Sequence, residues 1–181
     1  MTAPVEALPA GADVMQQLVE SAGEAYQQAA DMTDLTEVIS TLMAVDAGRE
    51  TRVRLGGNLF DVVISSSGLQ ARGVVALMDE IQGGSGPVIE DPESGWFYWL
   101  VQPGSSSRWK PHSHAVCLGG PHTITLPSLN RAAPPGPYWL RPLAQVSNRL
   151  VALGPLSEAL AQIRPEPTPH AALAAQLGIA F

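Results

Sequence analysis

Three histidines and the only cysteine of the chain lie close together, in the spacing H-x-H-x2-C-x4-H. They are His112, His114, Cys117 and His122. Imidazole nitrogen and thiolate sulfur are ligands that zinc prefers, and alternation along a strand would place His112 and His114 on one face. The spacing matches no standard zinc finger, and the glutamate of a cupin-type H-x-H motif is missing. We therefore predict no metal here, only loop histidines and a buried cysteine, and keep the four residues as candidates.

A second cluster of functional side chains runs from Ser105 to Lys110 and combines hydroxyls, two cations and an indole. Such groups can contact phosphate and stack on a base. The alternative is a solvated loop whose indole folds back onto the core. For an anionic ligand, the predicted binding residues are Arg108, Trp109, Lys110, Arg131 and Arg141.

Catalytic motifs are not found around these clusters. Residues 94–157 contain no Asp or Glu, so paired carboxylates cannot come from this stretch. The glycine runs 83–86 and 119–120 do not lead from a strand into a helix, as a phosphate loop does. No Ser-His-Asp triad or nucleophile elbow is present. We predict a protein that is not an enzyme and has no cofactor.

Charge divides the chain into two parts. The first 48 residues hold eight carboxylates and no Lys or Arg, whereas residues 94–157 hold all four tryptophans and five of the ten basic residues. The formal net charge of −7 hides this division. The single cysteine, the lack of a signal peptide and the lack of a long apolar run predict a cytoplasmic protein without a membrane span.

Hydrophobic periodicity predicts how these residues are positioned. Apolar steps of three and four predict a helical hairpin within residues 13–48, with the second helix opening at Thr33 or Asp34. Further helices are expected from Ser65–Ser67 to Ile81, over 156–163 and over about 170–178. The expected strands cover 52–55, 59–64, 87–89, 96–101, 115–118, 123–126 and 138–140.

The pattern predicts an α+β fold, in which the hairpin is followed by a small mixed β-sheet with one crossover helix and C-terminal helices. The expected domains are an acidic helical arm over 1–48, an α+β body over 49–164, and a Pro-rich linker with a terminal helix over 165–181.

Four segments carry a resemblance to known proteins. They read LFDVV (59–63), GPVIEDPESGWFYWLVQPGSSSRW (86–109), CLGGPHTITLP (117–127) and PPGPYWLRP (134–142). This pattern resembles a group of small actinobacterial proteins, and it is similar to the later part of bifunctional DNA primase/polymerase N-terminal domains. It covers less than half of the chain. The D-x-D pair that holds two metals in such polymerases is absent from this sequence, so the resemblance implies a shortened, catalytically inactive relative that binds without nucleotidyl transfer.

Two functions therefore follow as expectations. The first is a non-catalytic binding or regulatory protein that contacts nucleic acid or nucleotide, with weak, salt-dependent affinity. The alternative is a protein–protein adaptor whose acidic arm docks on a basic partner, folds onto its own basic body or forms a homodimer, because the apolar stripes of the hairpin need burial. An unknown protein partner is expected in either case.

Overall fold

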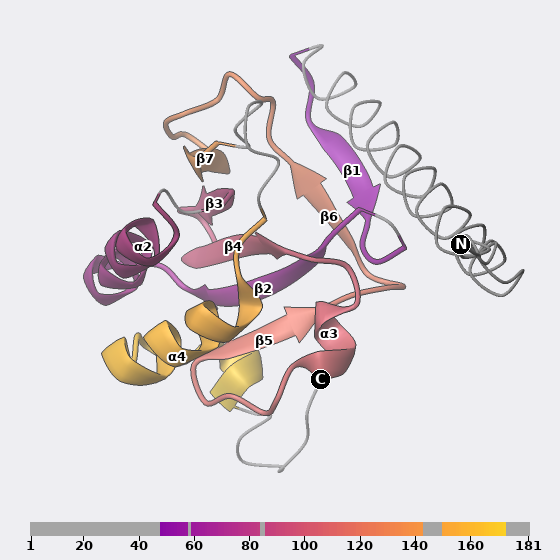
Figure 1. Cartoon of the computed structure of the whole chain (residues 1–181). Helices are drawn as coiled ribbons and strands as arrows, with labels where there is room; N and C mark the ends of the chain where they lie inside the picture. Colours follow the sequence, from indigo (N-terminus) through magenta and orange to yellow (C-terminus); the bar gives the residue numbers. More distant parts are fainter. Residues whose placement is uncertain (1–47, 58, 84–85, 143–149, 173–181) are drawn as a thin grey trace, which may run out of the picture. The chain divides into compact units, whose positions relative to one another are not determined.

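The computed structural model describes residues 48–57, 59–83, 86–142 and 150–172 (Figure 1). The chain divides into two units, Met1–Val38 and Ile39–Phe181, and every described residue belongs to the second. The predicted helical hairpin lies outside the described residues, as does the end of the predicted terminal helix. No helix in the described part is long and apolar enough to cross a membrane.

The described secondary structure alternates short strands with helices. The strands are β1 (Thr51–Arg54), β2 (Asp61–Ser66), β3 (Val88–Asp91), β4 (Trp96–Val101), β5 (Ala115–Leu118), β6 (Thr123–Leu126) and β7 (Tyr138–Arg141). The helices are α2 (Leu69–Gln82), α3 (Ser105–Arg108) and α4 (Leu153–Ile163). The α+β class is thereby confirmed. The bounds predicted for β4, β5 and β6 are also confirmed.

The strands form a five-stranded sheet in the order β5-β2-β4-β3-β7 and a two-stranded ribbon of β1 and β6. Every strand pair in the described part is antiparallel, so the prediction of a mixed sheet is wrong. The physical reason is the position of β4. The chain crosses from β2 through α2 to β3, as predicted, but β4 then returns between them and pairs antiparallel with both.

The start of α2 also differs from the prediction. The sequence predicts a cap among Ser65, Ser66 and Ser67, but Ser65 and Ser66 belong to β2. Gly68 takes the cap position, with φ of 117° and no side-chain cap. Ser65 is buried, and its Oγ accepts a hydrogen bond of 2.9 Å from Trp99 Nε1. Its hydroxyl is used inside the core because β2 is buried along its whole length.

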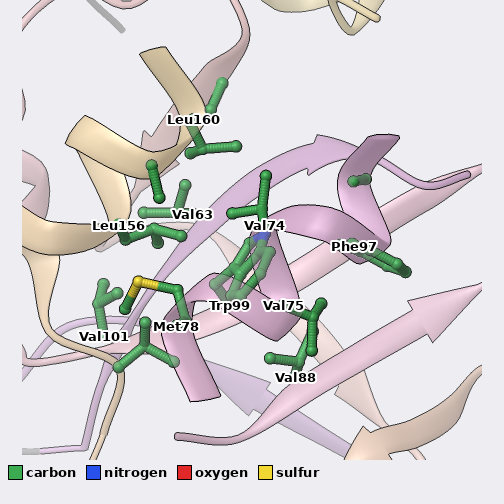
Figure 2. Packing of buried hydrophobic residues seen from close by; sticks show 14 of the residues in the cluster. Val63, Val74, Val75, Met78, Val88, Phe97, Trp99, Val101, Leu156 and Leu160 are labelled. Atoms are coloured by element: carbon green, nitrogen blue, oxygen red, sulfur yellow. The ribbon is translucent and has the colours of Figure 1, made fainter. Parts of the chain in front are cut away.

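One face of the sheet packs against α2 and α4 (Figure 2). Alternate residues of β2 and β4 point to this side, and the helices cover them with apolar side chains. The largest fully buried side chains of this layer come from both the sheet and the helices. They are Trp99 and Phe97 of β4, Met78 of α2, and Leu156 and Leu160 of α4. Burial of large apolar side chains, at about 1.5–3 kcal/mol for each, stabilises this layer.

The opposite face packs against the β1–β6 ribbon. The β2–β5 ladder leads, through turns at 55–60 and 119–122, into the β1–β6 ladder, so the ribbon curls over the sheet (Figure 1). Val53, Leu55 and Leu126 of the ribbon are buried in a cluster with Ile89 and Trp139 of the sheet.

The two C-terminal helical segments were both predicted, and α4 begins earlier than expected. α4 begins at Leu153, three residues before the predicted start. Residues 169–172 are helical, and Thr168 Oγ1 caps them by accepting from Ala171 N–H at 3.1 Å.

Candidate anion-binding site

α3 begins the candidate site, and a buried carboxylate fixes its position. The Asp61 side chain is 1% exposed, and its Oδ2 accepts a hydrogen bond of 2.8 Å from the Ser106 N–H. Gly119 lies against the same residues, because a Cβ placed there would be 2.2 Å from Ser106 Oγ and 3.1 Å from Asp61 Oδ1. The short helix is therefore held in place by contacts with β2 and with the β5–β6 turn.

A pocket of about 480 Å³ lies beside α3. It is bounded by the end of α2, the segment after β4, α3 itself, and residues 150–155. Its polar side chains are Gln82, Gln102 and Arg108. Of the described residues that line it, only Arg108 is charged, and we refer to it as the Arg108 pocket.

Backbone packing holds the C-terminal wall of this pocket in place. Val151 N–H donates to Leu100 O at 2.8 Å, which joins the wall to β4. Gly86 allows this approach, since a Cβ there would lie 2.5 Å from the Val151 nitrogen. Gln82 Oε1 accepts from Ala152 N–H at 3.2 Å. The next residues, Leu153, Gly154 and Pro155, open α4 and line the pocket, and this helix N-terminus has no side-chain cap.

The three predicted residues of the 105–110 segment have different environments. Arg108 is exposed, and its Nε donates a long hydrogen bond of 3.5 Å to the carbonyl of Gly104, the residue before α3. Lys110 is exposed as well. Trp109 is 8% exposed and belongs to the core under the helices, with its ring 5.7 Å from that of His112. The indole therefore lies folded on the core and offers no open face for a base in this conformation.

The other two predicted arginines are not brought to the Arg108 pocket. Arg141 pairs with Asp79 of α2 through Nη2–Oδ2 at 2.7 Å and Nε–Oδ1 at 3.3 Å. Arg131 pairs with Glu50 at 3.2 Å. Neither Arg131 nor Arg141 is among the residues that line the Arg108 pocket. Sequence position alone did not show that acidic residues outside 94–157 neutralise both side chains.

His112 and His114 lie near each other but are engaged with backbone groups. His112 Nε2 is 3.1 Å from Ser157 O, and its Nδ1 accepts a hydrogen bond of 3.1 Å from the His114 N–H. His114 Nδ1 is 2.7 Å from Pro165 O. Burial lowers the pKa of His112, the Ser157 carbonyl raises it, and His114 lowers it further. These histidines join the 112–114 loop to α4 and to the segment that follows it.

Cys117 and His122 are directed elsewhere. Cys117 is buried in the core under the helices, where burial raises the pKa of its thiol to about 12, with a further increase from Asp61 and a decrease from Arg108. His122 Nδ1 is 2.9 Å from Gly119 O in the β5–β6 turn. Within the described ranges, three or more His, Cys, Asp or Glu side chains do not gather as metal ligands would.

Several residues of the pocket were missed by sequence reasoning. Gln82 and Gln102 end helical or strand segments and carry no motif of their own. The early start of α4 had one usable signal, since Pro155 is typical of the first turn of a helix. Asp61 belongs to a buried strand as predicted, but no signal in the sequence showed that its carboxylate supports α3.

Comparison with known proteins finds no match for this chain: no protein-family model fits it, and neither a curated protein nor a solved structure is similar to it. The resemblance to the actinobacterial group and to primase/polymerase domains stays a prediction from its motifs.

Proposed function

We propose that the chain is a non-catalytic, cytoplasmic binding protein that holds an anionic ligand, nucleic acid or nucleotide, through the Arg108 pocket. The observation that carries this proposal is the charge of the lining, in which Arg108 stands without a carboxylate among the described residues. A guanidinium donates several hydrogen bonds in a fixed fork that fits phosphate oxygens. The first residues of α4 also line the pocket, and a helix N-terminus carries a partial positive charge that favours an anion.

The size and polarity of the Arg108 pocket suit one nucleotide unit rather than a large duplex surface. A volume of about 480 Å³ lies in the usual range for small-ligand pockets. The Gln82 and Gln102 amides supply neutral donors and acceptors for a base or a sugar. Lys110 adds a second exposed cation two residues after Arg108 and strengthens the long-range attraction of a phosphate chain.

The non-catalytic part of the proposal rests on the sequence. Two-metal nucleotidyl transfer needs a pair of carboxylates that bridge the ions, and the chain contains no D-x-D pair. A degenerate primase/polymerase-like module would retain binding without transfer. In this proposal the acidic arm is a helical hairpin that regulates access to the basic body.

Arg108→Ala tests the proposal against a charge-matched control. Fluorescence anisotropy with a labelled 15-nucleotide single strand and with a labelled ATP analogue, at low and at physiological salt, gives the affinity. Arg108→Ala is expected to weaken binding about tenfold or more, since a charged hydrogen bond contributes about 1.5–3 kcal/mol. Arg54→Ala, which removes an exposed arginine of β1, is expected to change affinity by about twofold at most.

Two outcomes contradict the proposal. If both variants lose the same affinity, the probes are attracted by net charge alone and the pocket does not bind them. If neither probe binds at low salt, the proposal of an anionic ligand is rejected. The better candidate is then the adaptor, in which the acidic arm docks on a basic partner.

A further inference from the structure

The β1–β6 ribbon has one edge along which backbone groups are directed outward. Leu55 N–H donates to His122 O at 2.8 Å, which makes these two residues a hydrogen-bonded pair of the antiparallel ladder. Alternation of such pairs turns the N–H and C=O of Thr123 and Thr125 away from β1. In the part of the chain that the structure describes, β6 pairs with β1 only. An unpaired edge of this kind can accept another strand.

A second pocket, of about 350 Å³, lies between β6 and the face of the five-stranded sheet. Its floor and walls are apolar and aromatic: Ile64, Ile89, Trp96, Tyr98, Leu118 and Ile124. The Trp96 and Tyr98 rings meet edge to face with centroids 6.4 Å apart, and both are only partly buried. Burial raises the pKa of Tyr98, so its hydroxyl stays protonated at neutral pH. Partly exposed aromatic rings beside a cavity are typical anchors for a partner side chain.

One end of this pocket carries a fixed negative charge. Asp91 is the charged residue of its described lining. Its carboxylate is held in the β3–β4 turn, where Oδ1 accepts from Glu93 N–H at 3.0 Å and Oδ2 accepts from Ser94 Oγ at 2.7 Å. Glu93 is exposed beside it. This end therefore favours a cationic side chain.

We propose that this edge and pocket bind an extended segment of a partner protein, which pairs with β6 as an added strand and places an aromatic or large aliphatic side chain in the pocket and a Lys or Arg beside Asp91. Backbone hydrogen bonds to Thr123 and Thr125 supply affinity, and the pocket and the carboxylate supply specificity. The site lies on the ribbon side of the sheet, away from the face covered by α2 and α4, so it is independent of the Arg108 pocket.

Peptide selection on the full-length protein gives the first test. A display library of random ten-residue peptides is selected against the immobilised chain, and enriched peptides are synthesised for affinity measurement. We expect them to contain an aromatic or large aliphatic residue with a Lys or Arg nearby. Failure to enrich any peptide overturns the proposal, as does enrichment of acidic peptides.

Backbone pairing is then tested on the peptide, which leaves the protein unchanged. Methylating the amide nitrogens of alternate residues blocks one strand edge and leaves the other free. One of the two alternate series is expected to lose binding by tenfold or more, and the other to keep it. Equal binding of both series overturns strand addition and shows a pocket for side chains alone.

Protein variants locate the bound segment. Tyr98→Ala is expected to weaken the selected peptide about tenfold, and Asp91→Asn to reduce the preference for a basic residue. Glu80→Gln, which removes an exposed carboxylate of α2 on the other face of the sheet, is expected to bind as the natural protein does. Unchanged affinity in both Tyr98→Ala and Asp91→Asn contradicts the proposal. If the protein dimerises as its concentration rises and the peptide does not disrupt the dimer, the edge instead binds a second copy of the chain, and the proposal is overturned.

Discussion

Several polar side chains in this protein are placed by hydrogen bonds to residues far away in the sequence. The sequence predicts Ser65 as a cap and His112 as a candidate ligand, and both have other roles in the structure, whereas Asp61 lies in a buried strand as predicted and also supports α3. Ser65 accepts from the Trp99 indole, and Asp61 accepts from the first turn of α3. Such contacts join residues more than 30 positions apart, so no local pattern shows them.

His112 leads to a prediction on the pH dependence of stability. In the neutral ring with hydrogen on Nε2, that hydrogen is donated to Ser157 O and Nδ1 accepts from the His114 N–H. A proton on Nδ1 would face this N–H, and burial lowers the pKa of the ring as well. The unfolded chain takes up a proton near pH 6.5 whereas the folded chain does not, so stability falls as pH decreases through this region.

Urea unfolding between pH 5.5 and 8 measures this effect. His112→Ala is expected to be less stable than the natural protein at pH 8, because Ser157 O and the His114 N–H lose their partner. The loss of stability on acidification is expected to be smaller in the variant, so the two curves converge. Curves that stay parallel over this range would show that His112 does not contribute to the pH dependence.

At the scale of elements, the sequence predicted most strands and helices but not their arrangement. Short runs of apolar and β-branched residues between turns rich in Gly and Pro located β4, β5 and β6. The sequence did not show that β4 returns between β2 and β3, since strand pairing depends on contacts between distant segments. The candidate site was predicted in part, because Arg108 was identified from its local cluster while Gln82, Gln102 and residues 150–155 were brought to it by the fold.

Two glycines allow a prediction on how the elements fit. Gly119 has no room for a Cβ beside Ser106 and Asp61, whereas a Cβ on Gly73 of α2 would meet Ile163 at 3.7 Å, an ordinary contact. Gly119→Ala is expected to lower the free energy of unfolding by about 1–3 kcal/mol through overpacking. Gly73→Ala is expected to raise it by about 0.4–1 kcal/mol, because alanine restricts the unfolded chain and favours the helix.

Denaturant unfolding of the two variants checks the opposite signs. Anion binding gives a second measurement, since Gly119→Ala displaces the helix that carries Arg108 while Gly73→Ala leaves it in place. Weaker binding of the probes is therefore expected for Gly119→Ala only. If Gly119→Ala were as stable as the natural protein, the turn would have room to relax and would not fix α3.

The whole molecule combines an acidic N-terminal segment with a body whose exposed cations lie at separate places. Arg131 and Arg141 are paired with Glu50 and Asp79, whereas Arg108 and Lys110 are exposed at α3. The positive charge available to a ligand is therefore smaller than the composition suggests. In the proposed function, a segment that screens or covers α3 would reduce binding, and this is the part that we propose for the acidic segment.

The last prediction tests this regulation in the full-length chain. The carboxylates of residues 1–48 are Glu6, Asp13, Glu20, Glu24, Asp31, Asp34, Glu37 and Asp46. Changing all eight to the corresponding amides keeps the chain length and takes the formal net charge from −7 to +1. If the acidic segment competes with the ligand for the basic body, affinity for a labelled single strand is expected to rise at low salt. The gain is expected to shrink at physiological salt, because charges beyond about 8–10 Å are then screened.

Arg108→Ala in the amide-substituted background separates competition at the pocket from a general change of charge. The extra affinity is expected to disappear with Arg108→Ala and to remain with Arg54→Ala, since both remove one positive charge but only Arg108 lines the pocket. Circular dichroism melts of each protein check that the body remains folded. An amide-substituted chain that melts cooperatively and binds no tighter than the natural one contradicts regulation by the acidic segment, whatever the affinity of the Arg108 pocket itself.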